Sequence, residues 1–248
     1  MKLKHYLLLG AALLLLAGCF FLPNTVAGIT DSRRLDNLVM IDSQSVNFET
    51  APELALPERI ALVASPTTEL LALKTGKVMD FETAGGRVVA ELVRFFTGGP
   101  FKFAADKSVM EECTAAFVID SENPSINIIV WEIVLSDLYG NVVNVTMDDE
   151  TGMILKLIYR FGSGGRLPDG AQGPSAGIGQ TDEEFRAAAL RLTEMMASYY
   201  GLTITLADYK FSGSLAYYRA DISGDKELIP MYGVVRASDF TMNEKLLY

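Results

Sequence analysis

The sequence predicts an α+β fold in which an N-terminal membrane-anchor helix is followed by two lobes, each made of one helix and an antiparallel sheet. Three observations predict it. The chain opens with a long apolar run, and two segments with helical periodicity are each followed by several short strand-like segments. A glycine-rich stretch, residues 160–180, separates the two sets.

Composition bounds the class of protein. The chain has 248 residues, half of them hydrophobic, which suffices for one large or two small domains with a sizeable core. Its net charge is −10, and no basic stripe compensates for it. DNA, RNA and anionic lipid all favour concentrated Lys and Arg, so we expect no nucleic-acid partner.

The residue types that build common catalytic and metal sites are scarce. His5 is the only histidine, which excludes most catalytic triads and most zinc sites in the body of the protein. Cys19 lies in the apolar run, so a disulfide with Cys113 is not expected, and Cys113 is interpreted as a small buried residue. The sequence therefore predicts no catalytic residue, no metal site and no cofactor.

The N-terminus predicts export. Residues 1–5 form a short tail with Lys2 and Lys4, and no further charged side chain occurs before Asp31. Residues 6–28 are interpreted as a transmembrane signal-anchor or a signal peptide, because their apolar run has roughly the 17 to 20 residues that cross a bilayer. The two lysines favour a single-pass cell-membrane protein with an extracytoplasmic C-terminal body. A cytoplasmic body is the alternative orientation.

A lipoprotein is the alternative to the anchor. Residues 16–19, "LAGC", resemble a lipobox that would present Cys19 for lipid attachment after cleavage. The apolar residues 20–22 favour the anchor instead, because a mature lipoprotein usually begins with small or polar residues. Both interpretations tether the rest of the chain to a membrane.

The next segments are assigned in order. Residues 29–79 are a poorly defined lead-in, within which "LPERIALVA" could form a short helix begun at Pro57. A helix begins after Asp80 and stops at "TGGP", residues 97–100. The strands predicted after this helix are 114–120, 126–137, 141–147 and 153–159. The second is apolar on both faces and is expected to be central.

Residues 160–180 contain seven glycines and two prolines, which is typical of a linker. In residues 181–248, Thr181 and Glu184 predict a capping box and Gly201 a helix stop. Strands are expected at 203–213, 215–222 and 230–238, so a helix followed by strands occurs twice. We favour two mobile lobes; the alternative is one continuous sheet in which the second half completes the first domain.

Three consecutive acids, Asp148, Asp149 and Glu150, precede Thr151 and Gly152 between two alternating apolar segments. A tight hairpin turn is the economical interpretation, with Gly152 supplying a positive φ. The carboxylates are expected to face solvent, each changing stability by under about 0.5 kcal/mol when neutralised. A calcium or catalytic site is the alternative, although the spaced ligands of a dedicated loop are lacking.

The helix, the strands and the closing "VTMDDETGMILKL" resemble the PepSY module over residues 80–159. Residues 181–248 show only a partial resemblance, because "DFTMNEKL" has no glycine at the corresponding turn. The resemblance implies a small α+β unit on exported or membrane-tethered bacterial proteins. It also implies a binding, inhibitory or regulatory role without catalysis.

We therefore expect a non-catalytic module that binds an unidentified protein or peptide at the membrane surface, such as an envelope protease or a signalling sensor. Residues 126–135 or an exposed sheet edge could accept a peptide as an added strand. One alternative is a structural cell-envelope component. Another is a carboxylate-based cell-wall hydrolase with acids from segments such as 130–137, which contains Glu132, or 238–244.

Mass spectrometry of the mature N-terminus distinguishes a signal-anchor from a lipoprotein. A signal-anchor leaves the chain beginning at Met1 or Lys2, and this is the expected result. A diacylglyceryl group on Cys19 would select the lipoprotein. Recovery of the full-length protein in the aqueous cytosolic fraction would contradict both.

Overall fold

The computed structural model describes residues 54–99, 101–162, 181–224 and 228–244, which belong to one compact unit spanning residues 41–248. The predicted anchor at 6–28 and Cys19 lie outside the described residues. Within the described ranges, every helix is too short or too polar to cross a bilayer. The elements are α2 (Leu56–Ala64), β1 (Thr68–Leu73), α3 (Phe81–Phe96), a 3-10 turn (Ala105–Lys107), β2 (Val109–Asp120), β3 (Asn127–Ser136), β4 (Val142–Asp148), β5 (Ile154–Arg160), α4 (Asp182–Tyr200), β6 (Ile204–Ser212), β7 (Leu215–Ser223), β8 (Leu228–Arg236) and β9 (Asp239–Met242).

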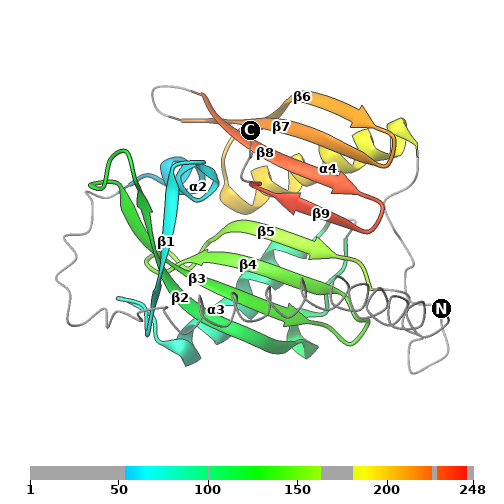
Figure 1. Ribbon diagram of the computed structural model, residues 1–248. Coiled ribbons are helices and arrows are strands. Elements are labelled where there is room, and N and C mark those ends of the chain that lie inside the picture. The colour runs from blue at the N-terminus through cyan, green and yellow to red at the C-terminus, as the bar shows by residue number, and fades with distance from the viewer. Residues whose placement is uncertain (1–53, 100, 163–180, 225–227, 245–248) are drawn as a thin grey trace, which may run out of the picture. The chain divides into compact units, whose positions relative to one another are not determined.

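All nine described strands form one antiparallel sheet in the order β1-β2-β3-β4-β5-β9-β8-β7-β6 (Figure 1). The predicted fold class is therefore wrong in its two separate lobes, because both helix-and-strand sets belong to one sheet. Strand β5 from the first half pairs with β9 from the second, from Leu157 opposite Met242 to Arg160 opposite Asp239. The sequence hid this pairing because β9 has only four residues and its partner lies some eighty positions earlier.

The order of elements repeats in the two halves. Helix α3 is followed by β2 to β5, and α4 is followed by β6 to β9. The strand order of the second set mirrors that of the first, so the last strands meet at the centre and β1 and β6 lie at the two edges (Figure 1). The predicted succession of a helix and strands thus occurs twice, with both sets in one sheet.

Helices α3 and α4 begin and end as their sequences predict. Asp80 caps α3 by accepting a hydrogen bond from Thr83 N. Thr181 and Glu184 form the capping box of α4, and Gly201 ends it in the left-handed region at φ 66°. Both helices pack on the same sheet face, α3 against β2 and β3 and α4 against β6, β7 and β8.

Aromatic rings fill this face where β5 meets β9. Tyr159 on β5 stacks on Phe240 on β9, with ring centroids 5.1 Å apart and planes inclined by 7°. Phe96 from α3 lies 5.6 Å from Tyr159, and Phe101 lies 4.6 Å from Phe240. Each half therefore buries large rings against the other, which a flexible pair of lobes could not do.

A buried polar network adds a second link between the halves. The Glu91 carboxylate on α3 accepts the Tyr199 hydroxyl of α4 at 2.7 Å and pairs with Arg87 and Arg94 at 3.0 and 3.1 Å. The same hydroxyl accepts the backbone N–H of Ile154 on β5 at 2.9 Å. One phenol thus connects both helices to the centre of the sheet.

Helix α2 covers part of the opposite face, with Pro57 in its first turn as predicted. Asn243, just after β9, donates from Nδ2 to Ile60 O at 2.7 Å and to Leu155 O at 3.0 Å. Thr68 on β1 donates from Oγ1 to Leu62 O at 2.5 Å. These bonds fasten α2 to strands from both halves of the chain.

We expect Tyr199→Phe to lower the free energy of unfolding by about 1 to 3 kcal/mol, because it strips Glu91 of a donor and Ile154 N–H of its acceptor. Urea unfolding of the full-length protein in detergent measures it. Because Trp131 is the only tryptophan, its fluorescence reports on the first half, while far-UV circular dichroism reports on both.

The two signals should change together in a single transition. Tyr217→Phe is the control, since this tyrosine is exposed on β7, and its cost should stay under about 0.5 kcal/mol. Two separated transitions would contradict a single cooperative sheet.

Candidate functional site

The acidic segment forms the predicted hairpin turn between β4 and β5. Gly152 has a φ of 71°, and its N–H donates to Asp148 O at 2.9 Å. The expectation that the carboxylates face solvent is wrong for two of the three. The exposed fraction is 0% for Asp148 and 1% for Asp149.

Asp149 binds the loop that follows β1. Its Oδ2 accepts the backbone N–H groups of Lys77 and Val78 at 2.8 and 2.7 Å. Its Oδ1 accepts Met79 N–H at 3.0 Å and the indole N–H of Trp131 at 2.8 Å. Four donors converge on one carboxylate, which compensates its charge in the interior.

Gly76 allows this approach. A β-carbon at this position would overlap Oδ1 of Asp149 and come within 2.7 Å of Met79 O. The loop can therefore close over the carboxylate only because residue 76 has no side chain.

Asp148 binds the helix that precedes β1. Its two oxygens lie 2.9 and 3.1 Å from one terminal nitrogen of Arg59 on α2, whose side chain is itself buried. Glu150 accepts from the other terminal nitrogen at 2.6 Å, and Thr151 donates to Asp148 from both N–H and Oγ1. Burial lowers the pKa of Arg59, but its bonds to Glu150 and Asp148 outweigh this and hold the pKa above its usual value.

These contacts give the acidic turn a structural role. Both carboxylate oxygens of Asp148 and of Asp149 accept hydrogen bonds from the protein itself. Among the described residues, no group of three or more His, Cys, Asp or Glu side chains is arranged to hold a metal ion. The turn fastens the segments on both sides of β1.

The other residues that the sequence singled out lie apart from one another. Cys113 is a half-buried free thiol on β2, and burial raises its pKa. Glu132 stands exposed on β3, accepts the Thr146 hydroxyl at 3.0 Å, and lines a shallow cavity of about 230 Å³. Asp137 is buried and holds a turn by accepting from the backbone N–H groups of residues 104, 139 and 141.

A larger groove of about 700 Å³ lies between the end of α3 and α4. Arg94 lines it, and its guanidinium lies 4.4 Å from the centroid of the Tyr199 ring. The same guanidinium bonds Tyr199 O at 2.6 Å and Glu91 at 3.1 Å. Arg94 is thus committed to the link between the helices.

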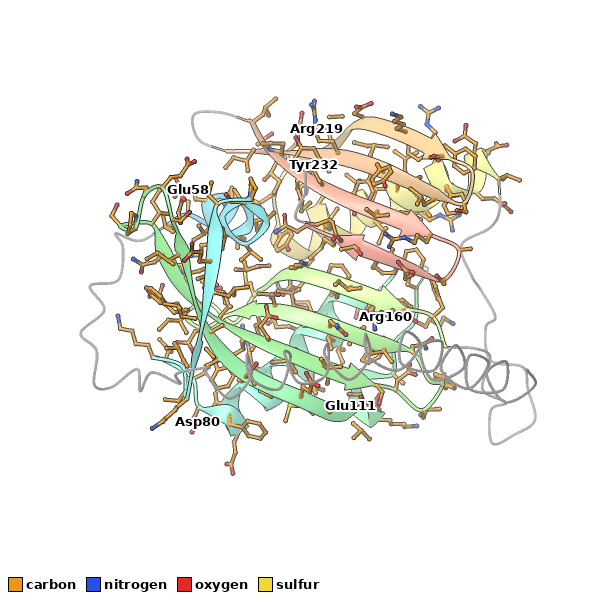
Figure 2. All side chains as sticks on the ribbon, in the orientation of Figure 1. Glu58, Asp80, Glu111, Arg160, Arg219 and Tyr232 are labelled. Carbon is orange, nitrogen blue, oxygen red and sulfur yellow. The ribbon has the colours of Figure 1, made fainter. Side chains whose placement is uncertain are left out.

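The open face of the sheet carries mixed polar side chains. Arg219 and Tyr232 lie side by side there, as directly opposed residues of β7 and β8 (Figure 2). Arg219 also pairs with Asp221 on its own strand at 3.1 Å. Such a face is typical of a solvated sheet surface and selects no ligand by itself.

Strand addition requires a strand with one unpaired side. The sequence suggested residues 126–135, but these belong to β3, which pairs with β2 on one side and β4 on the other. The two edge strands are β1 and β6. The edge β6 is irregular, because the register shifts between Leu206 and Asp208, and it exposes Asp208 and Lys210.

Strand β1 has one exposed charged side chain, Glu69, and no register shift. It pairs with β2 without a shift from Thr68 opposite Asp120 to Leu73 opposite Ala115. Leu70 is 58% exposed and Leu71 is 42% exposed, and as neighbours in a strand they face opposite sides of the sheet. Sequence reasoning missed this strand inside the lead-in, where the only signal was the short apolar run "LLAL".

The backbone phase of β1 follows from one bond. Ser121 N–H donates to Thr67 O at 3.0 Å, so this pair is hydrogen-bonded. Hydrogen-bonded pairs alternate along an antiparallel ladder, and therefore residues 69, 71 and 73 bond to β2. The N–H and C=O groups of Leu70 and Ala72 point the other way, where no further strand lies among the described residues.

Comparisons with protein-family models, with curated proteins and with solved structures found no match to this chain. The resemblance to the PepSY module thus stays a prediction.

We expect Asp148→Ala to cost about 3 to 5 kcal/mol of unfolding free energy, because it leaves the Arg59 charge buried with one partner lost. Asp149→Ala should cost a similar amount, since it removes the carboxylate that accepts four N–H donors, of which those of Met79 and Trp131 are buried. Glu150→Ala is the control; its side chain is 39% exposed, and its loss should cost less than about 1 kcal/mol.

Chemical denaturation of the three variants beside the unmodified protein tests this order. If Asp148→Ala and Asp149→Ala each lower the unfolding free energy by less than about 0.5 kcal/mol, the two carboxylates face solvent as the sequence predicted. Recovery of stability on addition of calcium would favour a metal site instead.

Proposed function

We propose that this protein is a membrane-attached, extracytoplasmic module that binds an extended segment of a protein or peptide partner without catalysing a reaction. The observation that carries the proposal is the edge strand β1. It pairs with β2 without a bulge and exposes two adjacent leucines, Leu70 and Leu71. Membrane attachment rests on the apolar residues 6–28 of the sequence.

Strand addition supplies both affinity and selectivity at such an edge. The outward backbone groups of Leu70 and Ala72 offer alternating donors and acceptors, which an extended main chain complements. Leu70 and Leu71 lie on opposite faces, so they favour a partner whose successive residues are both apolar. The partner class is therefore an extended apolar segment.

The rigidity of the edge supports a recognition role. Arg59 of α2, just before β1, is held by Asp148, and the loop after β1 is held by Asp149. A strand fixed at both ends loses little conformational entropy when it binds. We propose an envelope protease or a signalling sensor as the source of the partner segment, and a structural envelope contact is the alternative use of the same edge.

We expect peptides selected from a displayed random library on the full-length protein, in detergent, to protect the amides of residues 68–73 from hydrogen exchange. Ala72→Pro should weaken binding of the selected peptide about tenfold, since one outward hydrogen bond of about 1 to 1.5 kcal/mol is lost. Proline is tolerated there because the Ala72 N–H makes no bond to β2.

Leu228→Thr is the matched control, because it removes a comparably exposed leucine from β8, away from the β1 edge. It should leave peptide affinity unchanged. Protection in the groove between α3 and α4 instead of at residues 68–73, or equal binding by the Ala72→Pro variant, would overturn the proposal.

A further inference from the structure

We propose that Arg87 on α3 is a positioning residue for the β1 edge, which it stabilises through the acidic turn between β4 and β5. The inference rests on the proposed strand addition at β1 and names a residue outside that strand on which binding depends. It follows from what Arg87 contacts, from what holds Arg87 in place, and from what the turn itself holds.

Arg87 lies against the turn. Its Nη2 donates a long hydrogen bond to Thr151 O at 3.4 Å. A β-carbon on Gly152 would come within 2.5 Å of Nε, 3.0 Å of Cγ and 3.2 Å of Cδ of Arg87, so the arginine stem packs directly over the glycine. Residue 152 is thus glycine for two reasons, which are its φ of 71° and the side chain that covers it.

A buried carboxylate fixes Arg87. The same Nη2 lies 3.0 Å from Oε1 of Glu91, whose side chain is buried, although the side chain of Arg87 is 44% exposed. The other oxygen of Glu91 accepts the Tyr199 hydroxyl of α4 at 2.7 Å and pairs with Arg94 at 3.1 Å. Because the second half of the chain helps to hold this carboxylate, Nη2 has a fixed place between α3 and the turn.

The turn holds the segments on both sides of β1. Asp149 accepts the backbone N–H groups of residues 77–79 after the strand, and Asp148 binds Arg59 of α2 before it. Arg59 and Arg87 therefore contact the turn from two different helices. These short bonds require the carboxylates at a fixed place, so a shift of the turn loosens residues 77–79 and, with them, β1.

Arg94 offers a matched comparison. It also pairs with Glu91, and its side chain is exposed to a similar degree, 48%. Its further contacts are with Tyr199, and none of its bonds reaches the turn in the part of the chain that the structure describes. The two arginines thus share the charge compensation of Glu91 and differ in whether they reach the acidic turn.

Hydrogen exchange of the full-length protein in detergent tests the inference. Arg87→Met keeps an unbranched apolar stem and removes the charge that bridges Glu91 and Thr151. It should speed exchange of the amides of residues 77–79 about fivefold, as for residues that act through a network, and leave exchange within β3 unchanged. Arg94→Met is the control and should leave exchange of residues 77–79 unchanged.

Arg87→Lys tests rescue by a conservative variant. The bridge uses a single nitrogen, so one ammonium can bond the same two oxygens, and this variant should retain most of the protection at residues 77–79. Affinity for the selected peptide should fall about fivefold in Arg87→Met and stay unchanged in Arg94→Met. Exchange at residues 77–79 no faster in Arg87→Met than in Arg94→Met would overturn the inference, and so would equal exchange in Arg87→Lys and Arg87→Met.

The outcome is distinguishable from failure of the proposed function. Faster exchange in Arg87→Met, together with peptide affinity that Ala72→Pro leaves unchanged, would overturn strand addition and leave Arg87 as a residue that positions β1. Unchanged exchange in Arg87→Met, together with peptide affinity that Ala72→Pro weakens, would overturn the role of Arg87 and leave strand addition standing.

Discussion

The pairing of β5 with β9 is the constraint on which the rest of the architecture depends. Four residue pairs join two halves that the chain separates by a glycine-rich stretch, and stacked rings of Tyr159 and Phe240 cover the junction on one face. The Tyr199 hydroxyl bridges Glu91 and Ile154 beside it. Because the last strands of both halves pair with each other at the centre, β1 and β6 are the edge strands among the described residues.

The buried acidic turn connects this architecture to the proposed binding edge. Asp148 holds Arg59 of α2 before β1, while Asp149 holds the backbone of residues 77–79 after it. The two carboxylates are adjacent in the chain, yet one binds the helix that precedes β1 and the other binds the loop that follows it. A loss of either should loosen β1 as well as lower stability, so binding and stability share one set of hydrogen bonds.

Local sequence signals predicted what local interactions stabilise. The caps of both long helices and the turn at Gly152 were readable, because each depends on neighbours within a few positions. The apolar pattern of residues 126–137 also predicted a strand inside the sheet, and β3 is the third of the nine described strands. The burial of Asp148 and Asp149 was not readable, because their partners Arg59 and residues 77–79 lie about seventy to ninety positions away. Glu91 was missed for the same reason, since its partner Tyr199 belongs to the other half.

By itself the sequence determined the succession of two amphipathic helices, each followed by strands. It also determined a composition with one histidine and two cysteines, which leaves little scope for imidazole catalysis or disulfide bonds. Tertiary structure decided that the two sets share one sheet, that β1 rather than residues 126–135 lies at an edge of the described strands, and that two of the acids at a turn are buried. The physical reason is that strand pairing and charge compensation are contacts between distant segments. Their free energy exists only once the chain has brought those segments together.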